Sequence, residues 1–418
     1  MRSRIVILGG GTAGTLVANR LVRRLGDSVD VTVVDQDDSH VYQPGLLFVP
    51  FGRANPEDLS RSRRRQMDDA VRFVPSGVDS VDLAANRVTL SDHEDLDYDV
   101  LVIASGARLV PEETEGLTGP GWNDRVFTFY TPEGAAGLQR AVRDFSGGRV
   151  VVNVVDLPIK CPVAPLEFAF LADWYFHQRG LRDHVELVYV TPLDGAFTKP
   201  VASAHLGGLL RAKGIDLVTE FNTGRVDGEA RRLVGYDGRS VDFDLAVVVP
   251  LHSGAEYVGR SAGLGDELDF VPVDEQTLQS KAAPNVFAVG DAAALPTSKA
   301  GSVAHYEGDL LVENIDRLIH DLPLSGRFDG HTNCFIESGF GKAMLIDFNY
   351  DTEPLPGHFP STLGLPLLRE SRLNHLAKLG FEWFYWHVLL PGRDLPGLGS
   401  AMPTRGKPGL AGAGLKED

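Results

Sequence analysis

Short apolar runs alternate along the chain with stretches of helical period. The runs are rich in Val, Ile and Leu, end in small or polar residues, and cover 4–8, 29–34, 98–107, 149–155, 185–190, 245–250 and 285–293. Helices are predicted between them, most clearly over 15–25 and 162–179. Continuous apolar strands separated by helices are typical of parallel sheets covered on both faces. The pattern therefore predicts an α/β fold with two doubly wound sheets.

A glycine-rich turn follows the first apolar run. Gly9, Gly11 and Gly14 have G-x-G-x-x-G spacing, and Asp35 ends the second run. The glycines allow a tight turn, close approach of a pyrophosphate and close packing of helix on strand, while the helix N-terminus attracts the anion. A carboxylate about twenty residues further on can accept ribose hydroxyls. The segment therefore predicts a Rossmann-like dinucleotide site.

Composition narrows the function classes. The formal charge is −17, so the chain has no excess of Lys and Arg for binding nucleic acid. Two cysteines do not form a disulfide framework, and we expect a cytoplasmic protein because the first residues lack the pattern of a signal peptide. No His, Cys or carboxylate cluster has metal-ligand spacing, so no metal site is predicted. The short basic run 61–65 is interpreted as a solvated helix face.

The second doubly wound unit lacks a glycine turn. After the strand over 149–155 the chain reads Lys160-Cys161-Pro162 and continues to Pro165, which leaves neither the room nor the free N–H groups that a pyrophosphate needs. No tight NAD or NADP site is therefore predicted. Cys161 is expected to cap the helix over 162–179 beside Lys160, a setting that lowers the pKa of a thiol.

An aromatic helix is predicted near the end of the chain, over 374–390. Leu373, Leu376, Ala377, Gly380, Trp383, Phe384 and His387 recur at helical spacing, and further aromatic residues widen the apolar arc. Clustered aromatic side chains suit a membrane interface, so we expect the helix to lie in a membrane surface. A dimer interface, or packing against a hairpin near Cys334, is the alternative.

The chain resembles the sulfide:quinone oxidoreductase family over nearly its whole length. The matching segments are the glycine turn, 42–47, Lys160 and Cys161 with 164–165, Gly290 and Asp291, 299–301 and 334–341. The resemblance implies an FAD-binding domain formed by 1–108 and 245–324 and a second Rossmann-like domain over 109–244. A C-terminal hairpin and amphipathic-helix region follows over 325–404. The Gly-, Lys- and Pro-containing tail, 405–418, is expected to be disordered.

The resemblance also implies residue roles. Cys161 and Cys334 are implied to be redox cysteines that converge at the flavin and pass sulfur between them. The residues implied to contact FAD are Gly9, Gly11, Thr12, Ala13, Gly14, Asp35, Gln43, Pro44, Val78, Ala104, Ser105, Gly106, Gly290, Asp291, Lys299 and Ala300. Lys299 is expected to face the pyrimidine ring of the flavin. The candidate walls of a quinone pocket are Phe340, Phe348, Tyr350 and Phe381.

The implied function is oxidation of sulfide to polysulfide or persulfide sulfur, with electrons passed through FAD to a membrane quinone. Several family members carry a third cysteine where this chain has Tyr130, so FAD is expected to be bound non-covalently. The protein would be peripheral on the inner face of the cell membrane, and a homo-oligomer is possible. A type II NADH:quinone dehydrogenase-like flavoprotein and a non-catalytic flavin-binding sensor or assembly subunit are the alternatives.

Overall fold

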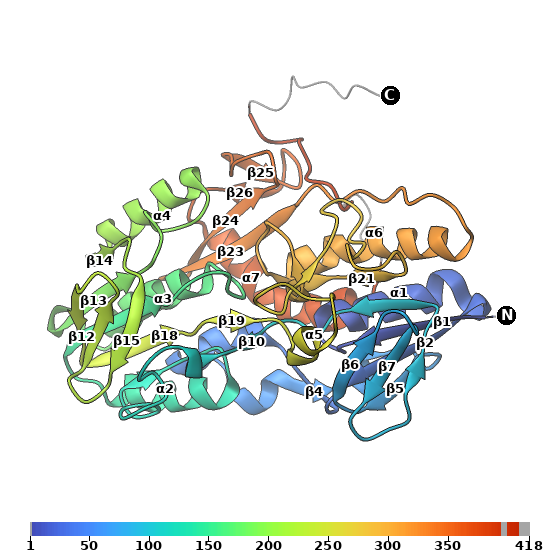
Figure 1. Ribbon diagram of the computed structural model, residues 1–418. Coiled ribbons are helices and arrows are strands. Elements are labelled where there is room, and N and C mark those ends of the chain that lie inside the picture. The colour runs from blue at the N-terminus through green and yellow to red at the C-terminus, as the bar shows by residue number, and fades with distance from the viewer. Residues whose placement is uncertain (1, 394–398, 409–418) are drawn as a thin grey trace.

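Two five-stranded parallel sheets form the framework of the computed structural model, which describes residues 2–393 and 399–408. Figure 1 shows them at opposite ends of the molecule, with the strands β10 and β19 crossing between them. The predicted α/β class with two Rossmann-like units is confirmed.

The first sheet has the order β21-β9-β1-β2-β5. Its strands are β1 Ser3–Leu8, β2 Val29–Asp35, β5 Arg72–Pro75, β9 Val100–Ile103 and β21 Val286–Ala288, and it packs with α1 Thr12–Leu25 and α6 Gly301–Ile319. From β1 the chain moves to β2 on one side and later returns to β9 on the other. Such a reversal of strand order leaves a crevice at the carboxyl ends of β1 and β9, where the glycine turn lies.

The second sheet has the order β11-β18-β12-β13-β14. Its strands are β11 Val126–Phe127, β12 Gly148–Val154, β13 Val185–Val190, β14 Ile215–Val218 and β18 Leu245–Val249, with helices α2 Pro132–Asp144, α3 Ala164–Gln178 and α4 Pro200–Ala212. The predicted return to the FAD domain at residue 245 is too early, because β18 pairs with β11 and β12 inside the second sheet. The two crossings pair with each other as β10 Arg108–Leu109 and β19 His252–Ser253.

Smaller elements extend both units. Three antiparallel sheets combine β3 Ser39–Val41 with β4 Ser60–Ser62; β6 Val78–Asp82 with β7 Arg87–Leu90 and β8 Leu96–Asp97; and β15 Thr223–Asp227 with β16 Arg232–Gly235 and β17 Ser240–Asp242. The strands β20 Val271–Pro272 and β22 Ala293–Ala294 pair in parallel, and α5 Glu256–Arg260 packs beside β6.

A four-stranded sheet and one helix form the C-terminal region between the two large sheets (Figure 1). The sheet has the order β23-β24-β26-β25, with β23 Thr332–Gly339, β24 Lys342–Phe348, β25 Gly357–Phe359 and β26 Leu365–Leu367. Helix α7 spans Arg372–Phe384 and continues as a π-helical turn over Tyr385–Leu389. The predicted helix over 374–390 therefore starts two residues earlier, because the Ser371 side chain caps it by accepting the Asn374 N–H.

The start of the tail predicted to be disordered is folded. Residues 405–408 pack against β25, where Gly406 O accepts the His358 N–H at 3.0 Å. Lys407 is buried and forms an ion pair with Asp347 of β24. The rest of the predicted tail, 409–418, lies outside the described residues. Among the helices of the described ranges, none is long and apolar enough to cross a membrane.

Candidate active site

The glycine turn forms an open cradle between β1 and α1. Gly9 has φ +105°, and a Cβ there would lie 2.4 Å from Ala104 O. A Cβ on Gly14 would lie 1.8 Å from Gly9 O, whereas one on Gly11 would meet nothing within 4 Å. No side chain caps the first turn of α1, which leaves its N–H groups available to an anion. The turn thus has the room and the donors that a pyrophosphate requires.

Asp35 lies at the edge of this cradle, and its carboxylate is held by the Gln36 N–H at 2.8 Å and by two donors from elsewhere in the chain. Its carboxylate accepts the Gly10 N–H at 2.7 Å and pairs with Arg63 at 2.8 Å. Burial raises the pKa of Asp35, and the Arg63 charge opposes that shift. The interpretation of 61–65 as a solvated helix face is wrong: the segment is the end of β4 and a 3₁₀ turn, and Arg63 is buried. Sequence cannot distinguish the one inward arginine in a basic run from its neighbours.

The two later segments implied to contact FAD meet this cradle. Ala288 of β21 pairs with Ile103 of β9, which places the Gly290 turn beside 104–106. Gly290 has φ +68° and donates its N–H to Glu307 of α6 at 2.6 Å. Within the described residues no hydrogen bond or ion pair engages the Asp291 carboxylate, whose pKa is raised by burial. This acid is therefore free to accept hydroxyl groups of a bound ribityl chain.

The Lys299 ammonium is bound by backbone carbonyl groups, and its expected place at the pyrimidine ring of the flavin stays a prediction. Helix α6 starts at Gly301, and the Lys299 ammonium donates to Asp291 O at 2.7 Å and Ala293 O at 3.0 Å. It also lies 4.0 Å from the ring centre of Phe270. The ammonium therefore holds the 291–293 turn, because a buried lysine needs acceptors for its three donors. The Lys299 backbone faces Cys161 instead, and its carbonyl accepts the Cys161 N–H at 2.7 Å.

The remaining predicted FAD contacts lie at the periphery of the cradle. Gln43 and Pro44 are exposed at the start of a 3₁₀ segment, Gln43–Phe51, and Val78 is half-buried at the start of β6. Ser105 accepts the Tyr257 hydroxyl at 3.0 Å, and Ala300 immediately precedes α6. Direct contact between these residues and the cofactor stays a prediction.

Cys161 lies in a strained turn between β12 and α3. Its φ is +46°, and its carbonyl accepts the Ala164 N–H at 2.9 Å and the Tyr130 hydroxyl at 3.4 Å. The helix begins at Ala164 after Val163, so Cys161 is not the helix cap. The expected lowering of its pKa is also wrong. Loss of solvation, followed by the nearby Glu167 carboxylate, raises the pKa of the thiol to about 12.

Cys334 reaches the same place from the C-terminal hairpin. It lies on β23 opposite Ile346, is buried, and belongs with Cys161 to one apolar cluster. Both thiols are free. Burial raises the pKa of Cys334, and a negative charge on Cys161 raises it further. The two cysteines of the chain thus lie at the same apolar cluster, with Cys334 buried on β23 and Cys161 partly buried in the turn after β12.

A buried ionic cluster, which the sequence did not reveal, adjoins the two thiols. Glu167 of α3 accepts the Glu337 N–H at 2.6 Å and pairs with Lys378 of α7. Glu337 on β23 pairs at 2.9 Å with His375, one turn before Lys378 on the same face of α7. Glu167, Glu337, His375 and Lys378 are called the ionic cluster below. Burial raises the pKa of Glu167, and the Lys378 charge opposes the rise that burial causes in the pKa of both thiols.

The four candidate quinone residues do not form one pocket. Phe340 lies at the tip of the β23–β24 hairpin against His177, whereas Phe348 lies at the other end of β24. Six residue steps along a strand separate the two ends by about 20 Å. Tyr350 packs on Phe328 in another core cluster. Only Phe381 lies beside the aromatic residues at the end of α7, with its ring 5.9 Å from that of Phe384.

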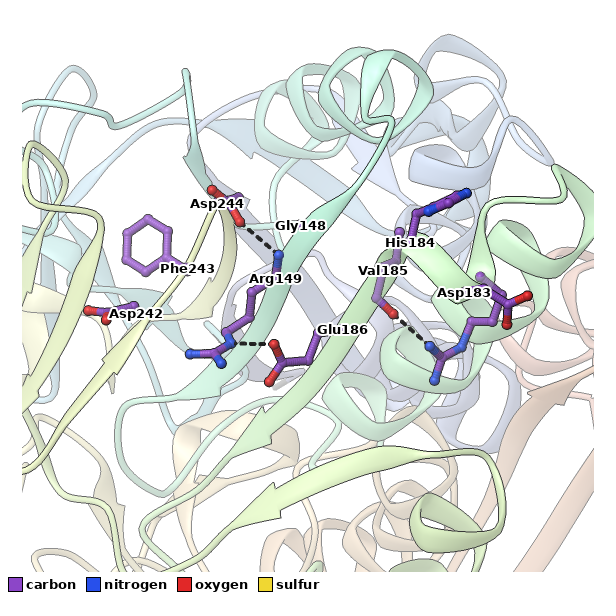
Figure 2. Close-up of a pocket in the computed structure, with 10 residues that line it drawn as sticks. Gly148, Arg149, Asp183, His184, Val185, Glu186, Asp242, Phe243 and Asp244 are labelled. Atoms are coloured by element: carbon purple, nitrogen blue, oxygen red, sulfur yellow. Dashed lines mark hydrogen bonds and ion pairs between the residues drawn. The ribbon is translucent and has the colours of Figure 1, made fainter.

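A further depression lies away from the predicted site. Its volume is about 570 Å³. Figure 2 shows Arg149 and Glu186 pointing toward one another from neighbouring strands, and the ion pair between them measures 2.9 Å. The depression is lined by the amino-terminal ends of β12, β13 and β18, whereas Cys161 follows the carboxyl end of β12. None of the predicted site residues lines it. A smaller cavity, lined by Gly290, Asp291, Lys299, Ala300 and Glu307, adjoins the cradle.

Two doubly wound sheets, the glycine cradle and the unpaired Asp291 define an FAD-binding oxidoreductase of the flavoprotein class with two dinucleotide-binding folds. Residues 3–154 match the family model described as pyridine nucleotide-disulphide oxidoreductase. The chain is 28% identical to the mitochondrial sulfide:quinone oxidoreductase of Dictyostelium discoideum, over 94% of this chain and 86% of that one. It is 25% identical to the Mus musculus enzyme of the same name, over 93% and 86%.

The fold agrees with these relatives. The structure of the sulfide:quinone oxidoreductase from the hyperthermophilic bacterium Aquifex aeolicus superposes with a TM-score of 0.81 at 20% identity, covering 94% of this chain and 92% of that one. The resemblance predicted from the sequence is confirmed. The chain is therefore similar in sequence to sulfide:quinone oxidoreductases and shares the fold of one of them.

Proposed function

We propose that this protein oxidises sulfide with Cys161 and Cys334 as its redox pair and passes the electrons through FAD to a quinone. The observation that carries the proposal is the proximity of the only two cysteines: both contact the same apolar cluster, a charge on Cys161 raises the pKa of Cys334, and the Cys161 N–H is bound by the carbonyl of Lys299. The names of the relatives support sulfide and quinone as the substrates.

The chemistry starts from an oxidised pair, Cys161–S–S–Cys334. Hydrosulfide attacks one sulfur, which forms a persulfide on that cysteine and releases the other as a thiolate. When a second nucleophile removes the outer sulfur, both cysteines are left reduced. Reoxidation of the pair to the disulfide needs a two-electron acceptor, which FAD bound at the cradle would supply. The outer sulfur leaves as a persulfide or polysulfide.

The ionic cluster fits a role in stabilising this charge. Both thiols resist ionisation because they are buried, and Lys378 favours the thiolate of each. Lys378 also pairs with Glu167, which in turn accepts the backbone N–H of Glu337 on the strand of Cys334. The cluster is therefore placed to compensate a thiolate and to accept or return a proton as the pair is reduced and reoxidised.

The outer face of α7 supports peripheral membrane binding. Leu373, Leu376, Leu379 and Trp383 are exposed to solvent by 54%, 63%, 45% and 63%. An amphipathic helix of this kind buries its apolar face in the lipid interface. A quinone would then enter beside Phe381 at the inner edge of α7, and we place the protein on the inner face of the cell membrane.

Sulfide-dependent reduction of a short-chain quinone by the FAD-loaded protein tests the redox assignment. Cys161→Ser and Cys334→Ser should each lose more than 99% of the activity while retaining bound FAD. Tyr189→Phe, in the buried core of β13, is the matched control. Sulfide activity that survives both cysteine variants would overturn the assignment. NADH-dependent quinone reduction would favour the type II dehydrogenase alternative, which the proline-rich turn at 160–165 disfavours.

Co-sedimentation with anionic lipid vesicles tests the membrane face. The double variant Leu376→Ser/Trp383→Ser should lose vesicle binding, whereas Tyr236→Ser, which removes an 82% exposed aromatic residue from β16–β17, should retain it. If the double variant instead converts a dimer to a monomer in sedimentation velocity and still binds vesicles, the face is a subunit interface.

A further inference from the structure

The C-terminal segment is docked directly on the glycine cradle. The Tyr385 hydroxyl, in the π-helical turn after α7, lies 2.7 Å from Thr12 Oγ1 and 2.6 Å from His40 Nε2. Tyr385 and His40 are buried, at 3% and 2% exposure. Thr12 is the first residue of α1, whose N-terminus forms the anion site. A side chain from the end of the chain thus meets the turn formed by its beginning.

The backbone after Tyr385 is bound to the same helix. Asn19 donates to Leu390 O at 2.8 Å, and Arg23 donates to Pro391 O and Gly392 O at 2.5 Å each. Together with Thr12 these side chains lie along α1 from its first turn to its last. Pro391 and Gly392 end the helical segment, so their carbonyls have no partners within it and accept these donors instead.

The hydrogen bonds of Tyr385 restrict the cradle. A phenol has one proton, so it donates to His40 or Thr12 and accepts from the other if both bonds are made. In either arrangement the Thr12 hydroxyl is held by Tyr385. The π-helical turn brings the ring into this position, and such turns are frequent at functional sites. His40 is kept neutral because burial, followed by the Arg63 charge, lowers its pKa to about 4.

We propose that Tyr385 is a positioning residue that couples the binding of FAD at the cradle to the docking of the segment 372–392. The cradle is glycine-rich, so ordering it for FAD costs conformational entropy. The Tyr385 contact orders the cradle before FAD binds and so reduces that cost. The coupling free energy is the same in both directions. Bound FAD therefore stabilises the docked segment by the same free energy by which the docked segment strengthens FAD binding. The proposal rests on the FAD site and not on the sulfide chemistry.

The test compares Tyr385→Phe with the wild type, using the full-length FAD-loaded protein. The variant lacks the two hydroxyl contacts and should bind FAD about 5- to 10-fold more weakly in equilibrium flavin fluorescence. The matched control is Tyr98→Phe, because the Tyr98 hydroxyl is buried in the same domain and has no hydrogen-bond partner in the part of the chain that the structure describes. FAD affinity of Tyr385→Phe within twofold of the wild type would overturn the proposal.

Amide hydrogen exchange provides a second measurement that needs no variant. Removal of FAD from the wild type should raise exchange in 385–392 at least tenfold, with a much smaller change in β13 of the second sheet. Unchanged exchange in 385–392 would overturn the coupling. Failure of the sulfide proposal is distinguishable, because Cys161→Ser should lose turnover while FAD affinity and exchange stay at wild-type values.

Discussion

The buried carboxyl group of Glu307 makes the stability of this protein depend on pH. Glu307 is fully buried on α6, where one oxygen accepts the Gly290 N–H at 2.6 Å and the other has no hydrogen-bond partner among the described residues. Burial raises its pKa from 4.5 to about 8. A shift of that size disfavours the ionised form in the folded protein by about 5 kcal/mol.

The sign follows from proton binding in the two states. Above pH 4.5 the unfolded chain loses this proton, whereas the folded protein keeps it until the pH passes about 8. Stability therefore falls as pH rises through this window. Glu307→Gln preserves an acceptor for Gly290 and cannot ionise. Between pH 5 and pH 8 the wild type should lose about 3 kcal/mol more unfolding free energy than this variant.

Urea unfolding followed by tryptophan fluorescence at pH 5, 6, 7 and 8 measures the difference. The gap between Glu307→Gln and the wild type should widen steadily with pH. Glu229→Gln, at an exposed position, is the control and should follow the wild type at every pH. A gap for Glu307→Gln that stays constant across the four pH values would refute the reasoning, since a constant offset reports packing and not ionisation.

Three further outcomes are expected. Lys378→Met leaves the Glu167 carboxylate buried without its cation and should cost about 3–5 kcal/mol in urea unfolding, whereas adding Glu167→Gln should recover most of that loss. Lys407→Met removes a buried partner of Asp347 and should lower the melting temperature by several degrees, as differential scanning calorimetry would detect. Gly14→Ala places a methyl group 1.8 Å from a carbonyl of the cradle, so the protein should purify without flavin absorbance.

Local signals accounted for much of the fold. The apolar runs and the glycine turn predicted the strands and the first helix because each depends on neighbouring residues: continuous apolar strands, helical period, and glycine where the backbone needs room. The C-terminal helix was also predicted from the helical spacing of its apolar residues. Its outer stripe, including Leu376 and Trp383, is the exposed face.

The errors concern contacts between distant segments. The expected helix cap at Cys161 requires helical geometry from Pro162, but the pairing of Lys160 with Lys299 and the positive φ of Cys161 delay the helix to Ala164. The raised pKa of Cys161 depends on surrounding residues that sequence spacing does not identify. The four candidate quinone residues were chosen because they are aromatic. In the structure they do not share one pocket, and Phe340 and Phe348 lie at opposite ends of β24.

The sequence by itself determined the class of this protein: two parallel sheets, one nucleotide cradle, no second glycine loop, and two cysteines available for redox chemistry. The tertiary structure decided what surrounds those cysteines. Glu167, Glu337 and Lys378 come from three elements far apart in the chain, and only the packing of α7 on the β23–β24 hairpin brings their charges together. Periodicity and turn motifs depend on neighbouring residues. Burial, ion pairing and the docking of Tyr385 on the cradle depend on how segments distant in the sequence pack together.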